Sequence, residues 1–216
     1  MRSSGAVVIW LQHILESLHQ VDSGLDATDF LIDGDRRALL PGAKEQLPEQ
    51  FFVREEDESI DLALYLCPSV LATIQVDPPH RRLHSGNIEA LCIALEGVSH
   101  FVLLTWRAQR DWPVSALELE LQAEVDKFTV CWLLLAEQGV PLRQSADVLR
   151  RHLFRRWSLR DGLMAHEAVR YHHASRYAGR FCRRLSRRSE LGEVRRLSRR
   201  FFRVGLSEKL RNHAVV

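Results

Sequence analysis

Residues 87–106, NIEALCIALEGVSHFVLLTW, form the most apolar stretch of their length in the chain. A helix here places four polar residues within one stripe roughly 40° wide, at about 100° per residue: Glu89, Glu96, His100 and Arg107. Ile93 and Leu103 fall in the same stripe and apolar residues fill the other directions, so we expect the helix to be buried nearly all round. Its charged side chains then need partners inside the protein.

A second long helix is predicted at 115–137, between Pro113 and Pro141. Its first four residues, SALE, match a capping box, in which Ser115 and Glu118 satisfy each other's backbone amides. Further along, two groups of polar residues lie on opposite sides of the helix: Glu120, Glu124 and Lys127 on one side, and Gln122 and Thr129 on the other. One of these faces is expected to point inward, toward the neighbouring 86–109 helix.

The first 76 residues predict a mixture of helix and strand. An amphipathic helix is expected at 5–20, with Gln12, His13, Glu16 and Gln20 on its polar face. Glu16 and His19 have the E-x-x-H spacing of carboxylate-bridged metal bundles, but a solvated polar face is the favoured interpretation. Residues 50–55 and 60–66 are typical of an antiparallel hairpin, because apolar and polar residues alternate in the second segment. A short strand at 29–32 is the candidate third member of the sheet, and a short helix follows at 69–75.

The remainder of the chain predicts helices alone, because no proline follows Pro141 and the apolar spacing is helical. The expected ranges are 86–109, 115–137, 144–154, 163–187, 190–204 and 207–213. The predicted fold class is therefore α+β, predominantly α: a multi-helix bundle with a small N-terminal antiparallel β-hairpin packed on it. Residues 77–82 divide an N-terminal part, 1–76, from the bundle, 83–216, and we expect the two to behave as one cooperative unit.

Composition places the protein among soluble globular chains. It has 216 residues, of which 46% are hydrophobic and 27% charged. The four cysteines are widely separated, with no C-x-x-C pair, which is typical of free thiols in a reducing compartment. No signal peptide is predicted, and charged residues interrupt the best candidate for a membrane span, so we expect a cytoplasmic protein with no transmembrane segment.

The net charge of +2 conceals a strong asymmetry. Residues 1–141 hold 10 Lys and Arg against 22 Asp and Glu, whereas residues 142–216 hold 20 against 6. The two parts attract each other, either within one molecule or through an acidic partner. Arginine pairs in the C-terminal half could also follow a phosphate backbone, although no known nucleic-acid-binding motif accompanies them.

Carboxylate and imidazole groups on facing helices suggest one candidate site inside the bundle. Its members, chosen from the inward stripes and from the helix at 163–187, are Glu96, His100, Glu120, Glu124, Lys127, His166, Arg170, His173 and Tyr177. They could bind a small ligand or a metal, but no cofactor and no catalytic residue can be assigned. The alternative is a structural network that pairs Glu96 with His100, Glu124 with Lys127, and the 120/124 carboxylates with arginines.

Sequence motifs give little support to an enzyme. The chain contains no phosphate-binding glycine loop, no dinucleotide-binding glycine pattern, no H-E-x-x-H and no G-x-S-x-G. We therefore expect a non-catalytic binding or protein-interaction module, with a protein partner or self-association favoured over nucleic acid. A ligand-dependent or metal-dependent enzyme with the Glu/His site, and nucleic-acid binding through the arginine-rich half, remain the alternatives.

Overall fold

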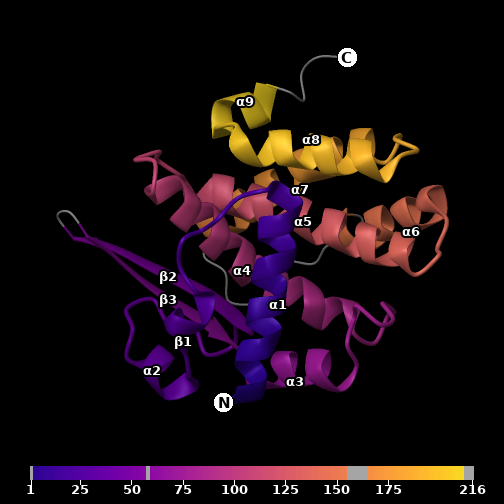
Figure 1. The fold of residues 1–216 in the computed structure, drawn as a ribbon. Helices are drawn as coiled ribbons and strands as arrows, with labels where there is room; N and C mark the ends of the chain where they lie inside the picture. The colour runs from indigo at the N-terminus through magenta and orange to yellow at the C-terminus, as the bar shows by residue number, and fades with distance from the viewer. Residues whose placement is uncertain (1, 57–58, 155–164, 212–216) are drawn as a thin grey trace.

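The computed structural model describes residues 2–56, 59–154 and 165–211. Within these ranges the chain forms nine α-helices, one 3-10 helix and a small mixed sheet (Figure 1). This is the α+β, predominantly α fold that the sequence predicted.

The N-terminal part contains short elements around one long helix. In chain order they are α1 (Arg2–His19), the 3-10 helix η1 (Ala27–Phe30), β1 (Leu31–Ile32), α2 (Gly34–Ala38), β2 (Glu49–Glu56), β3 (Ser59–Leu66) and α3 (Pro68–Val76). The rest of the described chain is helical: α4 (Ile88–Ala108), α5 (Ala116–Glu137), α6 (Leu142–Phe154), α7 (Ala165–Leu185), α8 (Leu191–Arg203) and α9 (Leu206–Arg211).

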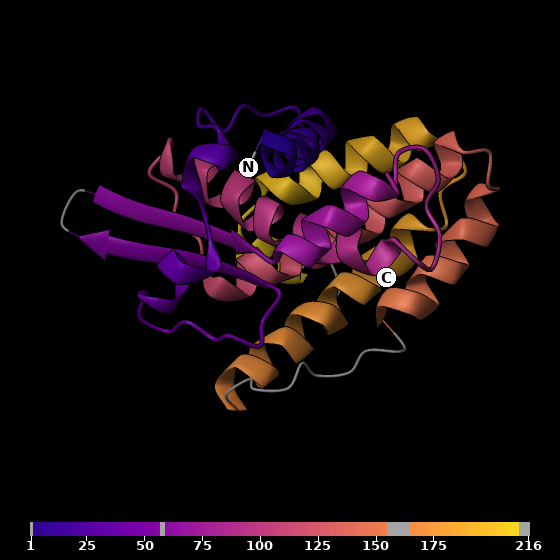
Figure 2. The same cartoon turned by 90° about the horizontal axis from the view of Figure 1, so that it is seen from below.

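The helices α4 and α5 pack against each other at the centre of the molecule. On the α4 side lie α1, α3 and the hairpin, while α6 and α7 cover α5. The paired strands β2 and β3 extend away from the helices (Figure 2). One hydrophobic core includes residues from both sides of the 77–82 segment. That the two parts unfold together stays a prediction.

The sheet has the order β1-β3-β2. The predicted hairpin is present, with Glu49 opposite Leu66 and Glu56 opposite Ser59 in an antiparallel register. The expected strand at 29–32 is shorter than predicted, because Asp26 caps a 3-10 helix that includes its first two residues. Leu31 and Ile32 alone pair with β3, and they do so in parallel.

Helix α4 is the one helix in the described ranges that is long and apolar enough to cross a membrane. Its most apolar 18-residue window is, however, 78% buried inside the protein. Burial of this kind favours a core helix over a membrane span, in line with the sequence prediction.

The polar face of α1 is only partly solvated: His13 and Gln20 are exposed, as expected, whereas Gln12 and His19 are buried. The His19 side chain is fully buried, and Gln12 is 7% exposed because it bonds to the segment that follows the helix. The Gln12 amide donates to Ser23 Oγ at 2.9 Å and to the Leu25 carbonyl at 2.7 Å. The prediction was wrong for Gln12 and His19 because the helix is covered on two sides: by this segment, and by α8 from the far end of the chain.

The acidic and basic parts of the chain meet within one molecule at several points. Glu137 pairs with Arg195 at 3.2 Å, and Glu118 pairs with Lys209 at 3.0 Å. Two further arginines, Arg199 and Arg203, donate to the backbone carbonyls of Leu18, His19 and Gln20 at the end of α1. These carbonyls have no partner within their own helix, so α8 caps the first helix of the chain.

Candidate functional site

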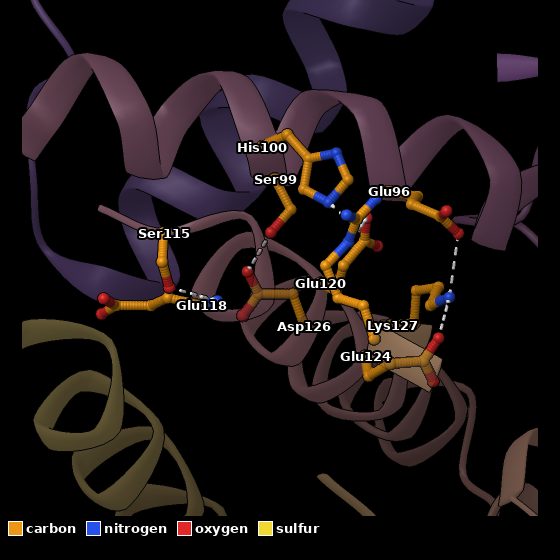
Figure 3. Close-up of polar contacts among 10 residues, drawn as sticks. Glu96, Ser99, His100, Ser115, Glu118, Glu120, Glu124, Asp126 and Lys127 are labelled. Carbon is orange, nitrogen blue, oxygen red and sulfur yellow. Dashed lines mark hydrogen bonds and ion pairs between the residues drawn. The ribbon is translucent and has the colours of Figure 1, made fainter. Parts of the chain in front are cut away.

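Five charged side chains form a buried seam between the central helices (Figure 3). Glu96 and His100 project from α4, and Glu120, Glu124 and Lys127 project toward them from α5. Each is between 3% and 8% exposed. The facing polar stripes that the sequence predicted are therefore in contact, and water has little access to them.

Lys127 links the two helices at one end of this buried seam. Its Nζ lies 3.0 Å from Glu96 Oε2 and 2.5 Å from Glu124 Oε1. Burial opposes the ammonium charge, but the two carboxylates outweigh it and raise the pKa of Lys127 above its usual value. Burial also raises the pKa of Glu124, although Lys127 acts in the opposite direction. One cation is thus shared between two buried carboxylates.

His100 pairs with Glu120 rather than with Glu96. Its Nε2 lies 3.6 Å from Glu120 Oε2, and the second Glu120 oxygen lies 3.9 Å from Arg170 Nε on α7. Burial lowers the pKa of His100, but Glu120, Glu49 and Glu96 together raise it to about 9, so the imidazole is charged at neutral pH. The expected interaction between Glu96 and His100 is present as a charge effect that raises the pKa of His100, whereas the ion pairs of the two side chains reach across to α5.

The remaining predicted residues come from α7 and behave differently. Arg170 joins the buried seam through Glu120. His173 is exposed, and its ring stacks against Tyr177, which is half-buried, with 6.3 Å between ring centroids. The side chain of His166 lies outside the described residues. Glu49 at the start of β2 was missed, because its contribution to the charge around His100 depends on how the hairpin packs on α4.

A second polar cluster, also missed as a whole, surrounds Asp126 on the other side of α5. Asp126 Oδ1 contacts His19 Nε2 at 2.9 Å and accepts a hydrogen bond from Gln122 Nε2 at 2.9 Å. Ser99 Oγ donates to Asp126 Oδ2 at 2.7 Å (Figure 3). All four side chains are at most 1% exposed. The available signal was the second polar face of α5, which included Gln122.

Glu118 takes part in only half of the predicted capping box. Its backbone amide donates to Ser115 Oγ at 3.2 Å, as expected. The carboxylate, however, forms ion pairs with Arg107 Nη2 at 2.9 Å and with Lys209 Nζ at 3.0 Å. Lys209 is fully buried, and it also donates to Gln122. Glu118 therefore anchors α9 instead of closing the cap.

An open groove of about 450 Å³ lies between α6 and α7. We call it the arginine groove and define it by Arg150, Phe154, Arg176, Gly179, Arg180 and Arg183, with His172 and Ser175 also in its lining. The three α7 arginines are exposed, and Arg150 is half-buried. Phe154 packs beside Gly179, where a Cβ would be in ordinary van der Waals contact, 3.4 Å from Phe154 Cγ. Phe154 thereby supplies an aromatic wall beside the four cations.

The arginine groove differs from the rest of the basic half in how its charge is balanced. Helices α6 and α7 contain eight arginines and two acidic residues. Within the described part of the chain, only one carboxylate forms an ion pair with any of the four groove arginines. It is Asp147, which lies 3.4 Å from Arg150. On α8, by contrast, Arg195, Arg196 and Arg200 each face a glutamate.

The buried seam and the arginine groove differ chemically. In the buried seam, cations and carboxylates neutralise one another away from solvent, which is the arrangement of the predicted structural network. Across residues 2–56, 59–154 and 165–211, no group of three or more His, Cys, Asp or Glu side chains is placed to hold a metal ion. In the arginine groove, by contrast, Arg176, Arg180 and Arg183 have no carboxylate in ion-pair contact among the described residues, so their guanidinium groups can face an anion. The chain matches no protein-family model, no curated protein and no solved structure.

Proposed function

We propose that the protein is a non-catalytic binding protein of the cytoplasm that recognises a negatively charged partner through the arginine groove. The observation that carries this proposal is the gathering of four guanidinium groups around one open groove, where a single described carboxylate contacts one of them. Arginine binds carboxylates and phosphates through two parallel hydrogen bonds, so the groove suits either kind of anion.

The balance of charge elsewhere supports a binding role in preference to catalysis. A catalytic acid or base must reach its substrate, whereas the carboxylates of the buried seam are at most 8% exposed and are held by Lys127, His100 and Arg170. The cytoplasmic assignment is supported by four cysteines that are all free thiols.

Chromatography on immobilised heparin, a sulfated polyanion, tests the proposal. The variant Arg176→Gln/Arg180→Gln removes two charges from the arginine groove, and Arg196→Gln/Arg200→Gln removes two exposed charges from α8. We expect the groove variant to elute at distinctly lower salt than the α8 variant, although both have the same net charge. Equal elution would mean that heparin senses net charge alone, and the proposed function would be rejected.

A competing candidate is a small polar ligand beside Glu120. It is favoured by one observation: the contacts of this carboxylate with His100 and Arg170, at 3.6 and 3.9 Å, are longer than hydrogen bonds. The variant His100→Ala distinguishes a structural role of His100 from a role in binding such a ligand. A fall in thermal stability indicates a structural seam, whereas unchanged or higher stability indicates that the imidazole is retained for a ligand.

A further inference from the structure

We infer that the partner of the arginine groove is a single strand of nucleic acid, held by its phosphates. This inference rests on the proposed function and names its ligand. Arg176, Arg180 and Arg183 follow one another along the same face of α7, and Arg183 lies seven residues beyond Arg176. At 1.5 Å per residue the three charges extend over about 10 Å, so they form a line suited to a polymer with repeating charge.

Aromatic rings accompany this line of charge. Phe154 forms part of the groove wall, and the His172 ring is exposed at the same face. On the adjacent face of α7, His173 stacks on Tyr177, and the Arg180 guanidinium lies 5.8 Å from the Tyr177 ring centroid. Proteins that bind single strands combine a basic groove with rings on which bases stack. Binding to an acidic protein surface does not require such rings, so their presence favours nucleic acid as the partner.

The packing of α7 favours a single strand over a duplex. A helix that reads double-stranded DNA must protrude far enough to enter the major groove. Helix α7 packs along α5 and against α6, and its arginines face a groove. A flexible strand can lie in such a groove, whereas a rigid duplex meets it only at the rim.

Fluorescence anisotropy with two labelled probes of equal length, a 12-residue oligouridylate and a 12-residue oligoglutamate, tests the inference. Each phosphate contact contributes about −0.7 to the slope of log affinity against log salt concentration. Four contacts therefore predict that the affinity for oligouridylate falls about 50-fold between about 50 and 200 mM salt. The Arg176→Gln/Arg180→Gln variant should show a fall of only about 7-fold, because two contacts remain. The α8 variant Arg196→Gln/Arg200→Gln should match the wild type.

A stacking variant separates base contacts from charge alone. We expect His172→Ala to weaken oligouridylate binding about 5-fold or more while its elution from heparin stays unchanged. Circular dichroism confirms that each variant is folded.

Four outcomes overturn the inference. They are tighter binding of oligoglutamate than of oligouridylate, tighter binding of a 12-base-pair duplex than of the single strand, a groove variant that binds oligouridylate as the wild type does, and a His172→Ala variant of unchanged affinity. If oligoglutamate binds through the arginine groove and oligouridylate does not, the proposed function survives and this inference fails. If the groove variant also elutes from heparin at the same salt concentration as the α8 variant, both the proposed function and this inference fail.

Discussion

Lys127 Nζ lies 3.0 Å from Glu96 Oε2, joining α5 to α4 at a point where both side chains are buried. The same ammonium contacts Glu124 at 2.5 Å, so removing it leaves two carboxylates without their shared cation. Breaking one side of a buried ion pair costs far more than breaking an exposed pair, because the remaining charge has lost its contact with water.

The first prediction concerns this cation. We expect Lys127→Met to lower the free energy of unfolding by about 3–5 kcal/mol, measured by urea denaturation. Arg54→Met, which breaks an exposed pair with Asp61 on the hairpin, serves as the control and should leave the unfolding curve unchanged. The triple variant that adds Glu96→Gln and Glu124→Gln should recover part of the loss. A Lys127→Met protein as stable as the wild type would contradict the network described above.

The second prediction concerns the pH dependence contributed by His100. Because the pKa of His100 is raised to about 9 in the folded protein, the folded state holds this proton more tightly than the unfolded state does. The stability that results is fully present below about pH 6.5 and is lost as the pH rises through 9. The difference in unfolding free energy between the wild type and His100→Gln should therefore shrink across this window.

Repeating the measurement in a Glu120→Gln background checks the cause. Glu120 raises the pKa of His100 more than Glu49 or Glu96 does, so its loss lowers this pKa and narrows the pH range over which the stability difference shrinks. If the pH range is unchanged in this background, the raised pKa of His100 is due to other carboxylates.

The third prediction has the opposite sign and concerns Lys209. Burial lowers the pKa of Lys209 to about 8, although Glu118 favours its charged form. Between about pH 8 and 10.5 the unfolded state binds more protons at this residue, so the stability of the wild type relative to Lys209→Met should rise across this range. Chemical denaturation at pH 7.5, 9 and 10.5 measures this difference. A relative stability that falls with pH would show that the Glu118 pair dominates over burial.

The fourth prediction uses two glycines in helices. A Cβ at Gly97 would lie 2.7 Å from Leu64 Cδ1 and 2.9 Å from Glu49 Oε1, so Gly97→Ala should push the hairpin away from α4. We expect a loss of about 1–3 kcal/mol in unfolding free energy. In α8, Gly192 has no atom within 4 Å of the same position, and Gly192→Ala should stabilise the protein by up to about 1 kcal/mol. Thermal denaturation of the two variants should give shifts of opposite sign.

Much of the helical architecture was predictable because it depends on local periodicity. The apolar stripe of 86–109 and the prolines around 115–137 located α4 and α5 to within two residues at each end. The short helix α2 was not predicted, since it rests on one capping interaction, in which Asp33 accepts from the Arg36 amide. Such a cap also fits a simple turn.

The polar interior was predictable only where a pattern repeated within one helix. The stripe of Glu120, Glu124 and Lys127 had such a pattern, and it faces α4 as expected. His19 and Asp126 could not be paired in advance, because they are 107 residues apart and His19 lies on what looked like a solvated face. The arginine groove likewise depends on how α6 and α7 pack, although the excess of arginine was evident from composition.

The capping of α1 by α8 has a consequence for the order in which the chain is synthesised. Arg199 follows Leu18 by 181 residues, and Arg203 follows His19 by 184. During translation from the N-terminus, the last carbonyls of the first helix therefore gain their native donors only after α8 has been synthesised. A nascent chain that stalls before α8 emerges has its central helices complete but the end of its first helix uncapped.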